Sequence, residues 1–297
     1  MRVFVTGATG FIGSRIVDEL VTADHQVLGL TRSMEGAARL AAQGVEPLHG
    51  VITDLDVLTD AARDCDAVIH TAFDHDFSRY VESCETDRQV ILALGRGLAR
   101  DRPLLVTSAT GMGEPGPGQP AREGVFDPAH PLPRVATELA AESLKADGAN
   151  VIVIRLPQVH DTVRQGLISF FIDVARQSGV SAWVGDGASR MSAAHVSDVA
   201  RLYRLALEQG RPGARYHAVA EGGVVMRDIA EVIAAGLGVP TRSIPADAAA
   251  AHFGPMAMFA SLDLIASSAA TQAELDWLPT GPDLLTDLRD MDYGRAT

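Results

Sequence analysis

Cysteine and positive charge are both scarce in this chain, and each shortage disfavours a class of protein. Cys65 and Cys84 are the two cysteines among 297 residues, so the sequence suggests neither a disulfide framework nor a zinc cluster. The 25 lysines and arginines are outnumbered by 38 aspartates and glutamates, which gives a formal charge of -13 and a pI near 5.0. We therefore expect no nucleic acid, anionic membrane or metal as a partner, and a cytoplasmic location.

Long hydrophobic runs are also absent. No apolar stretch approaches the roughly 18 residues that a membrane span needs, and the N-terminus shows no basic region followed by an apolar one. There is no internal repeat. At 297 residues the chain is longer than a single domain usually needs, so we expect a soluble protein with a main domain and a smaller lobe.

The most informative segment that is present lies at the N-terminus. Residues 3–5 form an apolar run typical of a buried first strand. Gly7 permits a tight turn, Gly10 lets the backbone approach a pyrophosphate, and Gly13 lets the next helix press against the sheet. That helix begins near Phe11 and directs its free N–H groups at the phosphates. Strand, turn and helix together predict a dinucleotide site.

Strands and helices then alternate, which predicts an α/β fold of the Rossmann type with a doubly wound parallel sheet. Apolar strand segments are expected at 25–32, 44–50, 66–73, 102–110 and 150–157. Helical patterns are expected at 34–44, 55–64, 80–100 and 134–148.

The domain boundaries follow from where this alternation weakens. We expect a dinucleotide-binding domain over residues 1–157, with a return to its sheet near 195–220. Residues 158–297 are expected to be mainly a substrate-binding lobe. A Gly- and Pro-rich segment at 114–133 is too long for a plain connector, so it is expected to border the site.

Several motifs along the chain resemble one family. They are TGATGFIG at 6–13, Asp54–Leu55, VIHTAF at 68–73, LLVTSAT at 104–110, IRLPQVH at 154–160, and VGDG at 184–187 followed by HVSDVA at 195–200. In this order they resemble the extended or atypical short-chain dehydrogenase/reductase superfamily, in its epimerase/dehydratase branch. The resemblance implies a Rossmann fold, a nicotinamide cofactor, a small-molecule substrate and a homodimer formed through two helices.

The resemblance also assigns cofactor contacts residue by residue. The pyrophosphate loop would comprise Gly7, Thr9, Gly10, Phe11, Ile12 and Gly13. The adenine contact would come from Asp54 and Leu55, the lining of the ribose and nicotinamide from Thr71, Ala72 and Phe73, and the nicotinamide cover from Pro157. Asp54 is equally suited to cap the helix that follows it, and the two roles are compatible.

The end of the second strand distinguishes the two nicotinamide cofactors. An NAD site places an acidic side chain there for the ribose 2'-hydroxyl, whereas this chain has Thr31, Arg32 and Ser33. A guanidinium between two hydroxyls suits a 2'-phosphate, so we favour NADP(H) over NAD(H). The alternative is that Arg32 is an exposed solubilising residue.

The catalytic positions depart from the family pattern. The family uses a Tyr, a Lys four residues later on the same helix face, and a Ser or Thr on the preceding strand. Ser108 matches the hydroxyl, but Arg134 stands at the Tyr position and Glu138 at the Lys position. No tyrosine lies between Tyr80 and Tyr203, so a small shift of alignment does not restore the motif.

Three explanations remain open for these positions. Arg134 and Glu138 could form a helix-surface ion pair, or they could replace the missing pair if the pKa of Glu138 is raised. Alternatively, the proton donor could be a histidine, with His130, His160 and His195 as candidates. His195 equally suits a structural role at a helix start, and His70 reads as part of its strand.

The preferred interpretation is an NADP(H)-dependent oxidoreductase that transfers hydride to or from a small ketone, aldehyde, imine or activated alkene. Ser108 would hydrogen-bond the reacting oxygen, Arg134 and Glu138 would complete the site, and His160 and His195 would contact the substrate. One alternative is a sugar-nucleotide epimerase or dehydratase. The other is a non-catalytic NADP(H)-binding redox sensor.

Overall fold

A seven-stranded parallel sheet forms the centre of the molecule, in the order β10-β6-β5-β4-β1-β2-β3. The structure is a computed structural model that describes residues 1–294. The strands are β1 (Arg2–Thr6), β2 (Gln26–Thr31), β3 (Glu46–His49), β4 (Ala67–His70), β5 (Leu104–Ala109), β6 (Val151–Leu156) and β10 (Arg215–His217). The chain order reverses beside β1, as in a doubly wound Rossmann sheet, which confirms the predicted fold class.

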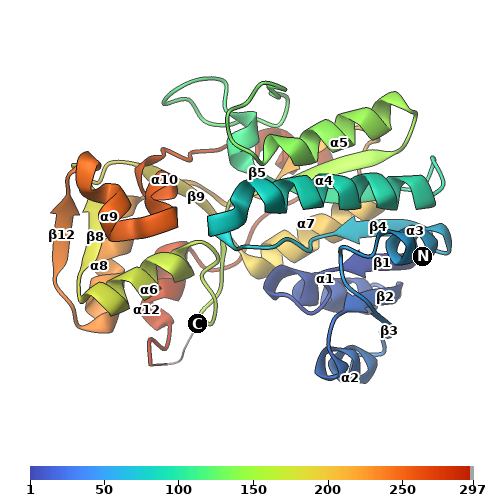
Figure 1. The fold of residues 1–297 in the computed structure, drawn as a ribbon, viewed down its shortest axis with the longest axis horizontal. Helices are drawn as coiled ribbons and strands as arrows, with labels where there is room; N and C mark the ends of the chain where they lie inside the picture. Colours follow the sequence, from blue (N-terminus) through green and yellow to red (C-terminus); the bar gives the residue numbers. More distant parts are fainter. Residues whose placement is uncertain (295–297) are drawn as a thin grey trace.

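Helices cover both faces of this sheet (Figure 1). They are α1 (Phe11–Thr22), α2 (Met34–Ala42), α3 (Leu55–Arg63), α4 (Tyr80–Gly97), α5 (Val135–Ala146) and α7 (Val196–Gln209). Alternate strand residues supply the two cores. Val3 and Val5 pack on the side of α1 and α7, whereas Phe4 packs on the side of α3, α4 and α5.

Local chemistry explains where several of these helices begin and end. Ser33 caps α2 by accepting from Gly36 N, and Asp54 caps α3 by accepting from Val57 N. The helix predicted to reach Arg100 ends at Gly97, because Leu98 has extended backbone and buries its side chain. Helix boundaries of this kind depend on tertiary packing.

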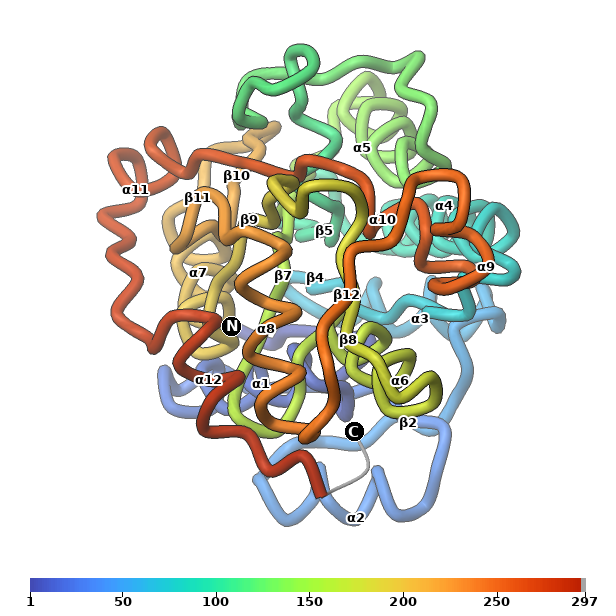
Figure 2. Tube along the Cα trace, turned by 90° about the vertical axis from the view of Figure 1, so that its left-hand side faces the viewer, coloured from blue at the N-terminus to red at the C-terminus, as the bar shows by residue number. Residues whose placement is uncertain are grey.

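The second part of the molecule is built around its own hydrophobic core. A three-stranded sheet contains β11 (Glu221–Val225), β9 (Arg190–His195) and β7 (Gln158–His160), and a two-stranded sheet pairs β12 (Thr241–Ile244) with β8 (Ser181–Val184). The helices are α6 (Ile168–Ser178), α8 (Met226–Leu237), α9 (Ala249–Phe253), α10 (Ala257–Ser261), α11 (Ala269–Leu275) and α12 (Leu284–Asp290). Figure 2 views this lobe end-on, with α6, α8 and α12 toward the reader. Short 3-10 turns are η1 (Phe77–Arg79), η2 (Thr110–Gly113), η3 (Ala246–Ala248) and η4 (Gly254–Met256).

The C-terminal segments connect the lobe to the main sheet. Strand β10 extends the sheet beside β6, and α7 packs on α1. Trp277 is fully buried in the same core, where its indole N–H donates to the carbonyl of Asp198 at 3.0 Å. Within residues 1–294, no helix is long and apolar enough to cross a membrane. Cys65 and Cys84 are both buried and free.

Candidate active site

The glycine turn after β1 is built for close backbone approach. Gly7 has a positive φ of 72°, and a Cβ there would lie 2.7 Å from Thr71 Oγ1 and 2.8 Å from Ala72 N. A Cβ at Gly13 would overlap the carbonyl of Gly7. The structure therefore brings together the glycine loop and the start of the Thr71–Phe73 segment, as the sequence predicts for one end of a dinucleotide site.

The N-terminus of α1 is open to an anion. Gly10 is its N-cap, so the helix has no capping side chain, and its first turn has no acidic residue. The first N–H groups of a helix lack acceptors within the helix, and they carry its positive dipole end. A Cβ at Gly10 would extend into this space, 3.1 Å from the carbonyl of Gly7. These residues fit the pyrophosphate of a nicotinamide dinucleotide.

The predicted adenine contact borders an open depression. It has a volume of about 580 Å³ and is lined by Val51, Thr53, Asp54, Leu55 and Asp56. The carboxylate of Asp54 accepts from Val57 N at 3.3 Å, so its capping role is realised.

At the end of β2, the three residues predicted for the 2'-phosphate differ in availability. Thr31 is buried, and the hydroxyl of Ser33 accepts from Gly36 N at 3.0 Å. Arg32 is exposed, and among residues 1–294 it has no hydrogen-bond or ion-pair partner. Arg39, which the sequence analysis missed, donates to the carbonyl of Thr9 at 2.7 Å. The free guanidinium of Arg32 is thus the group available to a phosphate.

Glu138 is held by arginines rather than poised as an acid. It is fully buried, and Arg155 donates to its two carboxylate oxygens at 2.7 and 2.8 Å. Arg215 donates at 2.9 Å, and so does the hydroxyl of Ser108. Burial pushes the pKa of Glu138 up, but the hydrogen bonds and charge of Arg155 outweigh it and hold the pKa below its ordinary value. The hypothesis of a raised pKa is wrong.

Arg134 is likewise turned inward. Its Nη2 donates to the carbonyl of Thr107 at 2.6 Å, and its Nη1 lies 3.1 Å from Asp87 Oδ2. Its guanidinium also lies 4.1 Å from the ring centroid of Phe73. Arg134 and Glu138 therefore have separate partners, and the proposed surface ion pair between them is not formed.

A buried polar network continues behind Arg134. Asp87 accepts from Thr137 Oγ1 at 2.5 Å and lies 3.0 Å from Nε2 of His70, whose Nδ1 lies 2.7 Å from Thr6 Oγ1. Burial raises the pKa of Asp87, but the charge of Arg134 and the hydrogen bond to His70 outweigh it, so the pKa is lowered. Both nitrogens of His70 are engaged, Nδ1 by Thr6 on β1 and Nε2 by Asp87 on α4, in agreement with its structural interpretation.

The same arginine that holds Glu138 also holds the long loop. Arg155 Nη1 donates to the carbonyl of Arg122 at 3.1 Å, and Nη2 donates to that of Val125 at 2.8 Å. Arg215 lies with its guanidinium 4.6 Å from the ring centroid of Phe126. The loop therefore borders the site through Arg155, which connects it to Glu138.

The histidines proposed as proton donors have structural partners. The ring of His160 is fully buried, with Nδ1 2.7 Å from Asp287 Oδ2, and burial lowers its pKa despite that carboxylate. His195 caps α7 by accepting from Ser197 N at 3.3 Å. Nδ1 of His130 accepts from the backbone of its own loop. His160 does not face a surface open to a substrate, because its whole ring is enclosed.

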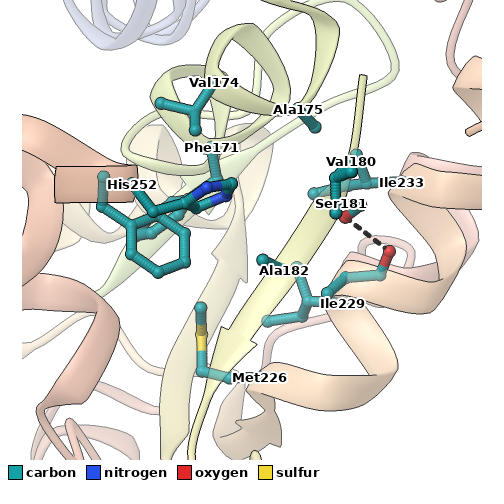
Figure 3. A pocket seen from close by; sticks show the side chains of 12 residues that line it. Phe171, Val174, Ala175, Val180, Ser181, Ala182, Met226, Ile229, Ile233 and His252 are labelled. Carbon is teal, nitrogen blue, oxygen red and sulfur yellow. Dashed lines mark hydrogen bonds between the residues drawn. The ribbon is translucent and has the colours of Figure 1, made fainter. Parts of the chain in front are cut away.

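A small cavity in the lobe lies among α6, β8, α8 and α9 (Figure 3). It holds about 10 Å³ and is lined by apolar side chains such as Phe171, Ile229 and Phe253, with Ser181 donating to the carbonyl of Ala230 at 2.7 Å. A space of this size accommodates at most one water molecule. It is a packing gap and not a substrate site.

The whole-chain comparisons agree with this geometry. Residues 3–220 match the model of the NAD dependent epimerase/dehydratase family. The chain belongs to that family. It is 43% identical over 295 residues to an uncharacterized protein of Schizosaccharomyces pombe, covering 99% of this chain and 100% of that protein.

Two further proteins are similar to this chain at lower identity. A 4-hydroxy-2-methyl-3-oxo-4-farnesyl-3,4-dihydroquinoline-1-oxide ketoreductase of Stigmatella aurantiaca is 28% identical, with 86% of this chain and 80% of that protein covered. A dTDP-glucose 4,6-dehydratase of Streptomyces venezuelae, solved with NAD, superposes with a TM-score of 0.76 at 21% identity and covers 98% of this chain and 96% of that one. The latter shows a shared fold.

Proposed function

We propose that this protein is an NADP(H)-dependent oxidoreductase that transfers hydride to or from a small carbonyl-type substrate. The observation that carries the proposal is the uncapped N-terminus of α1 beside the Thr71–Phe73 segment, with the unpaired guanidinium of Arg32 at the end of β2. The similarity to a ketoreductase supports a carbonyl-type substrate. The bound cofactor would supply the hydride, or accept it, at its nicotinamide ring.

The roles of the chain's own residues follow from their contacts. Gly7, Gly10 and the first turn of α1 would hold the pyrophosphate, and Arg32 would hold the 2'-phosphate. Ser108 donates its hydroxyl proton to Glu138 in this structure. Rotation of that hydroxyl would let it donate to a substrate carbonyl in reduction, or accept from a substrate hydroxyl in oxidation. Glu138 would act as a positioning residue that orients Ser108.

The proposal also covers the lobe, the oligomeric state and the cellular location of the protein. Residues 158–297 would supply most of the substrate contacts, and Pro157, between β6 and β7, would cover the nicotinamide. A homodimer formed through two helices and a cytoplasmic location belong to the same proposal. Sedimentation of the purified protein tests the dimer.

The experiment is a screen for NADPH oxidation with ketones, aldehydes, imines and activated alkenes. We expect turnover, and we expect Ser108→Ala to reduce it by a factor on the order of ten to a thousand, with NADPH affinity unchanged. A wild-type rate in Ser108→Ala would remove Ser108 from the mechanism.

A non-catalytic NADP(H)-binding sensor is the second candidate. Ser108, Arg134 and Glu138 are all buried at 8% exposure or less, which favours it. Tight NADPH binding with no turnover in the screen supports the sensor over the enzyme. The epimerase alternative draws no support from the solved structures, because an identity of 21% shows the fold alone.

A further inference from the structure

The segment between β4 and α4 leads from the cofactor site to the lobe. It starts at the Thr71–Phe73 segment and ends where η1 meets lobe helices. The ring centroid of Phe77 lies 5.4 Å from that of Phe170 on α6 and 5.4 Å from that of Phe259 on α10. Figure 1 shows the start of α4 beside these two helices. The segment therefore lies at the junction of the Rossmann sheet and the lobe.

His75 lies within this segment, and one aromatic ring connects it to the position of the missing tyrosine. Its ring centroid lies 5.2 Å from that of Phe73, in an edge-on arrangement. The guanidinium carbon of Arg134 lies 4.1 Å from the centroid of the same Phe73 ring. Arg134 occupies the position of the family's Tyr. His75 and Arg134 thus contact one aromatic ring that belongs to the proposed lining of the nicotinamide.

His75 differs from the histidines around it in being accessible. His70 and His160 are buried at 1% exposure or less, and each contacts a carboxylate. His195 is engaged in capping α7. His75 is an exposed residue whose ring packs against the rings of Phe73 and Phe77, and among residues 1–294 it pairs with no carboxylate. His75 is therefore the histidine of this group whose ring is not held by a carboxylate or used as a helix cap.

We propose that His75 is the acid-base group that exchanges a proton with the substrate oxygen in place of the missing tyrosine. The proposal rests on the proposed function. In reduction, hydride adds to the carbonyl carbon, the C=O π pair takes the proton of the His75 imidazolium, and an alcohol and neutral imidazole result. In oxidation, neutral His75 takes the hydroxyl proton as hydride leaves the carbon.

The charges around His75 set the pH at which each direction runs. Partial burial against the neighbouring rings lowers its pKa and so does the charge of Arg134, while a hydrogen bond to the backbone of Phe73 and the charge of Asp74 raise it. The net result is a pKa below the ordinary value. Its neutral form therefore predominates near neutral pH, so oxidation is expected there and reduction is expected to accelerate toward acid pH.

The test compares His75→Gln with His25→Gln, a variant outside the proposed site in which the contact with Glu208 is lost. With NADPH and 4-nitrobenzaldehyde as the probe, we expect His75→Gln to lower kcat by roughly 10²–10⁴-fold and to abolish the fall in rate with rising pH. NADPH affinity, measured by fluorescence, should stay unchanged. His25→Gln should match the wild type. A wild-type rate and pH profile in His75→Gln would overturn the proposal while leaving the proposed function intact.

A readout independent of turnover is the titration of His75 by NMR of histidine-labelled protein, with the resonance assigned by its loss in His75→Gln. Asp74→Asn, at an exposed position, should lower the pKa of His75, and Arg134→Gln should raise it. The pH at which kcat falls should shift by the same amount as the NMR pKa of His75 in both variants. If the NMR pKa shifts while the pH profile of kcat does not, His75 is not the acid-base group. If the wild type oxidises NADPH with no member of the carbonyl panel, both the proposed function and this proposal are overturned.

Discussion

Arg32, at the end of β2, is exposed and positively charged, and within residues 1–294 no side chain or backbone group pairs with its guanidinium. We expect Arg32→Asp to weaken NADPH binding by roughly 10–100-fold, because a charge-assisted hydrogen bond to phosphate is lost and a like charge replaces it. NADH binding should change little. Fluorescence titration with both cofactors measures the ratio, and Arg63→Asp on α3 is the matched charge control. Equal losses of affinity for NADPH and NADH would show that Arg32 does not contact the 2'-phosphate.

Substitutions at two glycines of the turn are expected to have different effects, one on cofactor binding and one on stability. Gly10→Val should abolish NADPH binding and keep the fold, because its φ of -78° suits any residue and its Cβ would meet only the carbonyl of Gly7. Gly13→Val should instead destabilise the protein, because its Cβ would overlap that carbonyl. Calorimetry and circular dichroism distinguish the two. A folded Gly10→Val protein with wild-type affinity would show that the phosphates lie elsewhere.

The roles of individual residues were predictable from the sequence where their partners are close along the chain. The glycine turn and Ser108 are recognisable because local geometry and motif coincide. Glu138 was misjudged because its partners, Arg155 and Arg215, are 17 and 77 residues away and meet it only in the folded protein. His75 carried no periodic or motif signal, and its importance comes from the Arg134 guanidinium on the same ring.

Among the elements, the long loop and helix α5 depend on one buried ion pair. Arg155→Met should destabilise the protein by about 3–5 kcal/mol, because Glu138 would be buried without its main counter-charge. It should also free the carbonyls of Arg122 and Val125, so limited proteolysis should cut the loop faster. Urea unfolding measures the first effect.

The double variant is the control for this pair. Adding Glu138→Leu to Arg155→Met should recover part of the lost stability, because no unpaired carboxylate remains at that position. Arg215, which also binds Glu138, retains Glu142 as a partner. The single variant Glu138→Leu completes the comparison. If the double variant lost as much stability as the two single variants together, Arg155 and Glu138 would not be energetically coupled.

Six strands of the main sheet, β1 to β6, were predictable because six apolar runs alternate with helical patterns. The lobe was not, because β7 has three residues and β8 and β12 have four each, which is too short for a periodic signal. Their pairing joins distant parts of the chain, as in the contact of β12 with β8. Only their shared core makes them stable strands.

For the whole molecule, buried histidines set the response to acid. Burial lowers the pKa of His217 to about 4, and the neighbouring charge of Arg155 acts in the same direction. The unfolded chain binds this proton at a higher pH than the folded one, so stability is full above the ordinary pKa of 6.5 and falls as pH drops toward 4. The lowered pKa of His160 adds to this loss.

Urea unfolding at a series of pH values from about 8 to about 4 measures this loss. We expect the slope over this window to become smaller in His217→Gln, which has no titratable group. The lowered pKa values of Glu138 and Asp87 extend the loss to more acid pH in both proteins. An unchanged slope in the variant would show that His217 is not the group responsible.

The way α7 and Trp277 complete the core of the nucleotide-binding half has a consequence for synthesis on the ribosome. The face of the sheet that α1 packs on stays only partly covered until residues 196–209 have emerged, and the core is not filled until Trp277 follows. A nascent chain of residues 1–157 would expose Ile69, Leu105 and Ile152 to water and to chaperones. The cofactor site, though encoded almost entirely in the first half of the chain, is thus expected to become stable only when translation is nearly finished.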